Sequence, residues 1–452
     1  MVPFIIKFIG IMRQNFLEQA EGKNNMNSVI EKFGRIVDGQ IADHPARSRR
    51  LLTTAYRLNG WAGKHIFKKT TPSRLALSDA CNGVIIRPLE HPQESAMVSL
   101  FTPCELLQTF GMAPMFPEAL SAYLSGAGAE RGFIDAVERR GIPETFCSYH
   151  KILLGAAETG VLPKPRFIFN TTFACDANTL SFRRLAEFYG VPHFVLDVPF
   201  EQDETAVCYV ADQLKDCSKK MSALLDKPLQ EDVLRQTVQR SGQTLSAYQK
   251  YLAVRAEKSM PDEMTSEMYA AFALHVLLGT PEALHFAQGV LKEAEAAPAR
   301  GDELRLLWVH TLPHLDSAMI DLLDFNEKCQ IIANDICFDA PALTTVDDPW
   351  RAMARRLVEN NLNGSAQRRI DAVLEKAKQL QPDGIVWFCH WGCRQTGGAA
   401  QLGRVQLEAA GFPTLVLDGD GCDRSNCPPG QMTTRMQAFL ELLEEKHDSV
   451  HL

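Results

Sequence analysis

Several signatures that would assign a common function are missing from this sequence of 452 residues. The Gly-x-x-x-x-Gly-Lys-Ser/Thr pattern is absent, and no Gly-x-Gly-x-x-Gly follows a hydrophobic strand. The chain is therefore not expected to hydrolyse ATP itself or to bind a nicotinamide cofactor. No hydrophobic run is long enough to cross a bilayer, and the apolar start over residues 1–12 contains a lysine and no cleavage site. We interpret that start as a helix that packs on the body of a cytoplasmic protein with no membrane partner.

A surplus of positive charge is also missing. The chain has 47 Lys and Arg against 55 Asp and Glu, which gives a net charge of −8. Phosphate backbones are bound by concentrated Lys and Arg, so we expect no nucleic-acid partner. The local basic cluster at Arg47–Arg50 is interpreted as a solvated face.

Closely paired cysteines are missing too. The sequence has twelve cysteines but no Cys-x-x-Cys unit, and the chain is far longer than small domains stabilised by disulfides. We therefore expect a reducing cytosol, in which the thiols are metal-bound, catalytic or buried.

Two segments repeat the order strand, polar loop, helix and strand that is typical of parallel α/β units. The first unit has strands at 167–169 and 193–196, joined by a helix with apolar positions Leu180, Leu185 and Phe188 that ends at Gly190. The second unit has strands at 384–388 and 414–417, a loop at 389–398 and a helix at 399–410 that ends at Gly411.

In each unit a cysteine, Cys175 or Cys393, lies just after the carboxyl end of a strand. Ligands of open parallel sheets bind beyond that edge, so two facing domains would bring both thiols into one cleft. The fold class expected is α/β, with two domains of small parallel sheets flanked by helices, facing each other across the cleft, and a helical N-terminal region. The predicted parts are a helical region at 1–95, a first α/β domain at 96–225, a helical connection at 226–300 and a second α/β domain at 301–452.

The cysteines fall into two groups. Cys147, Cys175 and Cys393 stand beside loops or helix starts, whereas Cys208, Cys217 and Cys329 are interpreted as small buried hydrophobic residues. Spacing alone leaves an iron–sulfur cluster, zinc, a catalytic thiol and plain burial open for the first group. The acidic stretch Asp418–Asp423 lacks the spacing of a calcium loop and is interpreted as a turn after a strand.

Three blocks of sequence resemble the 2-hydroxyacyl-CoA dehydratase and benzoyl-CoA reductase family, in particular its cluster-binding subunit. In order, they are similar to the family's Pro-x-Glu and Met-Tyr-Pro-Glu motifs, to the segments with its first two cluster cysteines, and to its third-cysteine loop and closing helix. The blocks comprise Thr102–Leu107 and Pro114–Glu118, then Cys147–Tyr149, Gly155 and Asn170–Asp176, and finally His390–Arg394 and Gly430–Phe439.

The resemblance implies a [4Fe-4S] cluster held by Cys147, Cys175 and Cys393, with one iron left open. It also implies radical reductive chemistry on an acyl-CoA, most directly the dehydration of a 2-hydroxyacyl-CoA to an enoyl-CoA. Glu118 matches a position that handles protons near the substrate, and Glu105 is interpreted as a structural helix cap. The implied partners are a homologous second subunit and a separate ATP-hydrolysing iron–sulfur activator.

The sequence departs from the family pattern in places. The family's Ser-Gly-Ala-Pro segment corresponds here to Leu100–Pro103, and the residues after Glu118 are Ala119-Leu120 rather than Asn-His. Two further thiols, Cys104 and Cys389, are either bystanders or part of a larger metal site. The alternatives are therefore a double-cubane or benzoyl-CoA-type low-potential reductase, and a non-catalytic partner subunit.

Overall fold

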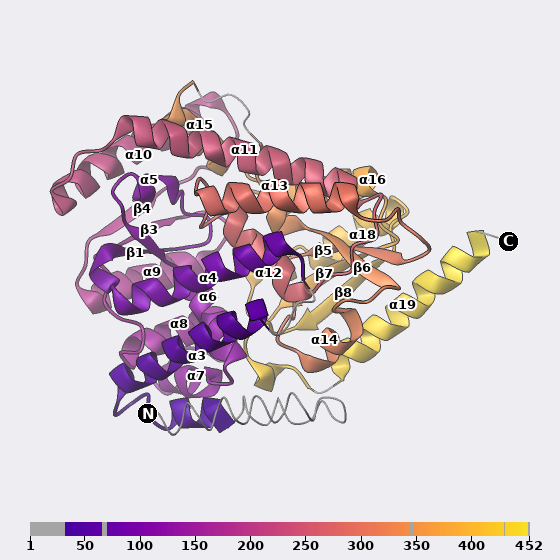
Figure 1. The fold of residues 1–452 in the computed structure, drawn as a ribbon, viewed down its shortest axis with the longest axis horizontal. Helices are drawn as coiled ribbons and strands as arrows, with labels where there is room; N and C mark the ends of the chain where they lie inside the picture. Colours follow the sequence, from indigo (N-terminus) through magenta and orange to yellow (C-terminus); the bar gives the residue numbers. More distant parts are fainter. Residues whose placement is uncertain (1–31, 66–69, 343–346, 429, 451–452) are drawn as a thin grey trace.

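The computed structural model describes residues 32–65, 70–342, 347–428 and 430–450. The helix expected over residues 1–12 lies outside these ranges. Two four-stranded parallel sheets form the framework, and they lie side by side in Figure 1. This confirms the expected α/β class with two small parallel sheets flanked by helices and preceded by a helical region.

The first sheet has the order β2-β1-β3-β4, and all of its paired strands are parallel. Its strands are β1 (Ser95–Val98), β2 (Ala113–Met115), β3 (Phe167–Thr171) and β4 (His193–Leu196). Helix α9 (Asp176–Tyr189) connects β3 to β4 and stops at Gly190, whose φ of 57° supplies the left-handed helix end. The first predicted unit is therefore present as expected.

The second sheet has the order β6-β5-β7-β8 and is also parallel. Its strands are β5 (Leu304–Val309), β6 (Cys329–Asn334), β7 (Gly384–His390) and β8 (Thr414–Gly419). Strand β7 runs two residues further than predicted, because Cys389 and His390 pair with Asp418 and Gly419 of β8. The helix predicted at 399–410 is present as α18 (Ala400–Ala409), and the predicted loop before it contains a short helix, α17 (Arg394–Gly397).

Helices cover the sheets and connect them. The segment predicted to be helical at 226–300 contains α11 (Glu231–Arg255), α12 (Met264–Leu274) and α13 (Pro281–Ala296). Helix α10 (Glu204–Leu225) contacts β4 and α11 contacts β6, so this layer lies over both sheets (Figure 1). The other helices of eight or more residues are α3 (Pro45–His65), α4 (Pro72–Glu90), α6 (Pro117–Gly126), α7 (Glu130–Glu138), α8 (Ser148–Glu158), α15 (Pro349–Val358), α16 (Ala366–Leu380) and α19 (Gln431–Val450). Shorter helices are α5 (Glu105–Gln108) and α14 (Ser317–Leu323).

In the described part of the chain, no helix combines the length and apolarity needed to span a bilayer.

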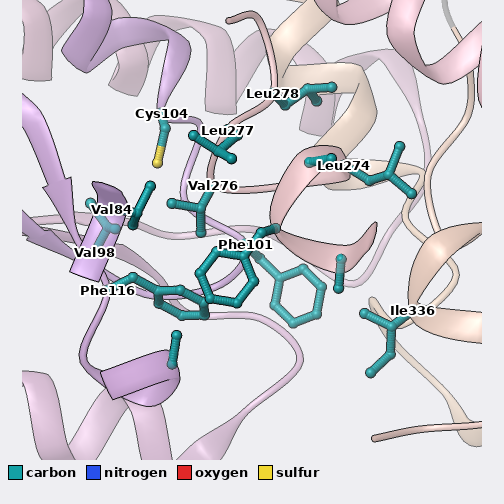
Figure 2. Packing of buried hydrophobic residues seen from close by; sticks show 14 of the residues in the cluster. Val84, Val98, Phe101, Cys104, Phe116, Leu274, Val276, Leu277, Leu278 and Ile336 are labelled. Carbon is teal, nitrogen blue, oxygen red and sulfur yellow. The ribbon is translucent and has the colours of Figure 1, made fainter. Parts of the chain in front are cut away.

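One hydrophobic core joins the two sheets. Strand β5 contributes Leu307 and Val309 to this shared core, and its alternate residues Leu306 and Trp308 to a smaller core on the other face. Figure 2 shows a part of the shared core in which Phe101 and Phe116, after two strands of the first sheet, pack with hydrophobic residues of α12 and its C-terminal loop. The two sheets therefore pack through common apolar contacts rather than through a hydrated interface.

Three sequence interpretations of single residues are wrong. Leu180 and Phe188 of α9 are 58% and 44% exposed, and Cys208 of α10 is exposed. The reason in α9 is geometric: its buried residues are Asn178, Ser181, Phe182, Leu185 and Ala186, which form one stripe at helical spacing. Leu180 lies on the opposite face and Phe188 lies at the edge of the stripe in the last turn of α9, whereas Leu185, Cys217 and Cys329 are buried as expected.

Glu105 is structural, but it makes an ion pair rather than a helix cap. Its carboxylate is fully buried and forms a two-point pair with Arg356 of α15, at 2.6 and 2.9 Å, and accepts a hydrogen bond from Ser241 of α11. The pair therefore fixes α5 to two helices that are distant in the sequence.

We expect Arg356→Met to lower the free energy of unfolding by about 3–5 kcal/mol, because it leaves the buried Glu105 carboxylate without its cation. Chemical denaturation followed by circular dichroism would measure this. The matched control is Arg355→Met, which removes the neighbouring arginine from a solvent-exposed pair with Glu204 and should cost less than about 1 kcal/mol. Equal losses in the two variants would contradict the structural role of the buried pair.

Candidate functional site

A cavity of about 450 Å³ lies beyond the carboxyl ends of both sheets. Residues within four positions after the ends of six of the eight strands line it, including Leu100 after β1, Phe116 after β2, His310 after β5 and Ile336 after β6. Cys175 follows β3 and Cys393 follows β7, and both line this cavity together with Cys147. The structure therefore brings the three thiols predicted from the sequence to one cavity, although Cys147 and Cys393 are 246 positions apart in the chain.

Each of these three cysteines immediately precedes a helix. Cys147 occupies the N-cap position of α8, Cys175 that of α9 and Cys393 that of the short α17. The first peptide N–H groups of a helix are not used within it and carry partial positive charge, which favours a thiolate over a thiol. The local folding of the chain therefore places three potential thiolates where the backbone stabilises their charge.

Gly392 allows two of the cysteine segments to touch. A Cβ atom at Gly392 would lie 2.6 Å from the backbone nitrogen and 2.8 Å from the Cα of Cys147, and the φ of Gly392 is +76°. Any side chain would therefore clash with a backbone and also require a conformation that L residues rarely adopt. The close approach of the Cys393 loop to Cys147 depends on this glycine.

We expect Gly392→Ala to lower Tm by at least about 2 °C, because a left-handed alanine alone costs roughly 1–2 kcal/mol and the clash adds to it. Differential scanning calorimetry would measure the shift. Gly397→Ala is the matched control, since Gly397 lies in the same segment and has open space where a Cβ would be built. A Tm loss as large in Gly397→Ala would show that the close contact is not the cause.

His390 connects Cys147 to the turn after β8. Its Nδ1 accepts a hydrogen bond from the backbone N–H of Gly421, so the proton of the neutral ring lies on Nε2. That Nε2 lies 3.4 Å from the sulfur of Cys147 and 3.4 Å from the hydroxyl of Ser148. Ser148 in turn donates to Asp420, which also accepts from two backbone N–H groups of its own turn. The acidic stretch is thus a turn, as expected, and Asp420 at its centre supports the ring that contacts Cys147.

His150 has the same relation to Cys175. Its Nδ1 lies 3.1 Å from the hydroxyl of Ser181, and its Nε2 lies 3.7 Å from the sulfur of Cys175. Burial lowers the pKa of His150 to about 3 and also lowers the pKa of His390, so both rings are neutral at pH 7. The residue before Cys175, Ala174, has a φ of 68°, and such strain in a residue other than glycine is concentrated at functional sites.

The pKa values of Cys147 and Cys175 depend on burial and on the neighbouring thiols. Burial raises the pKa of Cys175 to about 12 and the pKa of Cys147 well above its ordinary value, and the neighbouring Cys393 adds to both shifts. Without a cation among them, at least two of the thiols are therefore protonated at pH 7. A bound metal centre would reverse this preference, because a coordinated thiol is deprotonated.

Glu118 lies at the start of α6 and lines the same cavity. Burial raises the pKa of its carboxyl to about 8, although Asn178 and the backbone of Leu100 form hydrogen bonds that lower it. Its Oε2 atom is buried and has no hydrogen-bond partner among the described residues. Cys175 is close enough for Glu118 to raise its pKa. Glu118 is therefore a carboxylic acid at neutral pH, with an unsatisfied oxygen beside one of the thiols.

The three cysteines of the cavity supply sulfur donors only. No group of three His, Cys, Asp or Glu residues in the described part of the chain is arranged to hold one metal ion. The three thiols line one cavity, and the ligands of a cluster are further apart than those of a single ion because each thiolate binds a different iron. Thiolates are also the ligands that select such clusters.

Cys104 and Cys389 do not line the cavity. Cys104 is buried and lies among Val84, Val276 and Leu277 in Figure 2. Cys389 is half-buried, and the charges that act on it are those of Asp418, Cys393, Arg369 and Arg435. The bystander interpretation of both thiols stays a prediction.

Sequence reasoning missed several residues of the site. It did not assign roles to His150, His390, Asn178 or Asp420, nor to the close contact at Gly392. The signal that was available is proximity along the chain, because each of the two histidines lies three residues from a predicted ligand.

The sequence matches a known protein family over most of its length. Residues 99–443 match the family model of the 2-hydroxyglutaryl-CoA dehydratase D-component. This chain belongs to that family. The match covers seven of the eight strands and all three cavity cysteines, whereas strand β1 and helices α3 and α4 of the N-terminal region lie outside it.

Curated relatives of this D-component family member are dehydratase subunits. The chain is 23% identical over 386 residues to the lactoyl-CoA dehydratase subunit alpha of Anaerotignum propionicum, across 76% of this chain and 89% of the relative. It is 21% identical to the (R)-phenyllactyl-CoA dehydratase alpha subunit of Clostridium sporogenes, across 77% and 89%. It is 20% identical to the (R)-2-hydroxyisocaproyl-CoA dehydratase alpha subunit of Clostridioides difficile, across 76% and 88%. The resemblance expected from the sequence motifs is confirmed.

Proposed function

We propose that this chain is the cluster-bearing subunit of a 2-hydroxyacyl-CoA dehydratase, which converts a 2-hydroxyacyl-CoA to an enoyl-CoA and water. The observation that carries this proposal is that Cys147, Cys175 and Cys393 line one cavity with Glu118. The three relatives, named for the dehydration of lactoyl-CoA, phenyllactyl-CoA and 2-hydroxyisocaproyl-CoA, support the reaction class.

In this proposal the three thiolates hold a [4Fe-4S] cluster, which when bound supplies one electron and an open iron for radical chemistry on the thioester. The helix N-termini behind the cysteines stabilise the thiolate charge, and the neutral rings of His150 and His390 lie against two of the sulfurs. These protein groups orient the ligands and limit the access of water to them.

Glu118 is proposed to handle the proton of the leaving hydroxyl. Because its pKa is raised to about 8, the carboxyl is protonated at pH 7 and can donate to the 2-hydroxyl as the C2–O bond breaks. The resulting carboxylate is then able to accept the proton lost from C3, which completes the removal of one water.

Arg369 provides an anchor for the substrate. Its Nε donates to Asp335 at 2.7 Å, while Nη1 and Nη2 are buried without a hydrogen-bond partner among the described residues. Arg369 lines the cavity, so these two N–H-bearing atoms are available for the thioester carbonyl or another oxygen of the acyl-CoA.

The partners proposed are the substrate acyl-CoA, a second subunit and a separate ATP-hydrolysing iron–sulfur activator. The relatives are named as alpha subunits, which supports a second subunit. A separate activator agrees with the absence of a P-loop in this chain. All twelve cysteines are free, which supports a cytoplasmic location.

The test is anaerobic purification followed by iron and sulfide analysis and an assay with 2-hydroxyacyl-CoA thioesters, the second subunit and the activator. We expect about four irons per chain, since three thiolates hold one cubane cluster. About eight irons would favour the double-cubane reductase, which the positions of Cys104 and Cys389 outside the cavity lining argue against. A colourless protein without iron would favour a non-catalytic partner subunit.

A further inference from the structure

The cavity continues beyond the thiols along one face of α6. Glu118, Ala122 and Gly126 line it at helical spacing, together with Ala119 and Tyr123. At a rise of about 1.5 Å per residue, Tyr123 lies about 7.5 Å along the helix from Glu118. The small residues on this face leave room for a flat group beside the helix.

An aromatic wall, defined here as Phe116, Phe272, Tyr269, Tyr123 and Tyr56, lines this part of the cavity. Successive rings are in contact, with centroid distances of 5.3, 6.1, 6.4 and 5.1 Å, and three of the four pairs meet edge to face. The wall therefore begins two residues before Glu118 and ends at helix α3. Such rings favour an aryl ligand over an alkyl one, because edge-to-face contacts add roughly 0.5–1.5 kcal/mol to the burial of area.

The hydroxyls at the end of the wall differ in whether they have a hydrogen-bond partner. The Tyr123 hydroxyl has two: it donates to Asn82 at 2.9 Å and lies 3.1 Å from the Tyr269 hydroxyl. Tyr56 is only 6% exposed, and its buried hydroxyl has no hydrogen-bond partner among the described residues. A buried polar group without a partner costs roughly 1–3 kcal/mol, which a ligand with a polar atom at this point would remove.

We propose that the aromatic wall binds the side chain of a 3-aryl-2-hydroxypropanoyl-CoA whose ring has a hydroxyl at its far end, with Tyr56 as the hydrogen-bond partner. This rests on the proposed dehydratase function and specifies its substrate class. The C2–O bond breaks, a proton leaves C3, and the new C2=C3 bond is conjugated with the ring; water is the second product, and the reaction involves no net oxidation or reduction. A three-carbon lactoyl group has no ring to place against the wall.

The specificity determinant comes from the part of the chain that the family match does not include. Tyr56 belongs to α3, whereas the thiols and Glu118 lie within residues 99–443. The other four rings of the wall lie within the matched range, so the N-terminal region contributes the partner of the ring hydroxyl and the matched range contributes the rest of the site.

The test compares kcat/KM of the complete enzyme for lactoyl-CoA, phenyllactyl-CoA and 3-(4-hydroxyphenyl)lactyl-CoA in the native chain and in Tyr56→Phe. We expect the native enzyme to prefer the hydroxyphenyl substrate over the phenyl one by roughly tenfold, as one hydrogen bond to a buried hydroxyl predicts. In Tyr56→Phe that ratio should fall to about one. Tyr209→Phe, at a tyrosine that is 47% exposed on α10, should keep the native ratio.

A second variant guards against misfolding of the first. Ala122→Leu fills the space beside the wall and should reduce kcat/KM for both aryl substrates far more than for lactoyl-CoA. Equal use of all three thioesters by the native enzyme, or a ratio unchanged in Tyr56→Phe, would overturn the aryl assignment alone. Failure to dehydrate any of the three would instead count against the proposed function itself.

Discussion

Cys393→Ser is expected to abolish cluster binding and activity. The variant removes one of three sulfur ligands from the cavity, and serine oxygen is a poor replacement for the soft thiolate that iron–sulfur clusters select. The loss of activity should exceed the roughly 10–100-fold effect that removal of an outer partner of a ligand produces. Iron and sulfide analysis of anaerobically purified protein, together with the dehydratase assay, would measure both effects.

Cys389→Ser is the matched control for this experiment. Cys389 lies four positions earlier in the same segment, is half-buried and does not line the cavity. It should keep the native iron content and activity. Native iron content in Cys393→Ser would refute the proposed ligand set, and iron loss in both variants would indicate a larger metal site that includes Cys389.

Glu118→Gln is expected to lower kcat by about 10²–10⁴-fold, the range for removal of a general acid, while iron content stays native. Glutamine keeps the size of the side chain but cannot release a proton. For the native enzyme, activity should fall as pH rises through about 8, because the acid form is lost there. The variant's residual activity should show no such transition.

Glu118→Gln should also change how the stability of the fold depends on pH. The folded-state pKa of about 8 lies above the ordinary value of 4.5, so folding favours the protonated carboxyl and Glu118 costs stability increasingly between these two pH values. Glu118→Gln should therefore melt at a higher temperature than the native chain at pH 8.5, with the difference disappearing near pH 4.5. Glu231→Gln, at an exposed carboxylate in the first turn of α11, should have neither effect.

In the chain without a metal, the groups around the cavity cost folding free energy. One buried and two half-buried thiols, two neutral histidines and a protonated Glu118 place many polar groups in a small region. Left-handed residues at Ala174 and His310 add local strain beside the cavity. The shared hydrophobic core of the two sheets is what holds these groups in place.

Local sequence determined the strands, the helices between them and their ends. The apolar strand at Phe167–Phe169 and the left-handed stop at Gly190 can be predicted because backbone preference and hydrophobic pattern act over a few residues, whereas the last two residues of β3, Asn170 and Thr171, were expected in the loop. The motif blocks around Cys147, Cys175 and Cys393 were sufficient to predict both the family and the candidate ligands. A cysteine after the carboxyl end of a strand also predicted the cleft, since all parallel strands end at one edge.

Other features depend on contacts between distant segments. Sequence alone does not indicate that Gly392 touches the backbone of Cys147, or that Tyr56 of α3 completes an aromatic wall begun at Phe116. It also placed Leu180 on the wrong face of α9, because a short apolar pattern does not reveal which stripe the sheet covers. The chain's local pattern thus fixed which residues could hold a cluster, whereas the packing of the two sheets decided which groups surround it, because burial, pKa and hydrogen bonding exist only once distant segments meet.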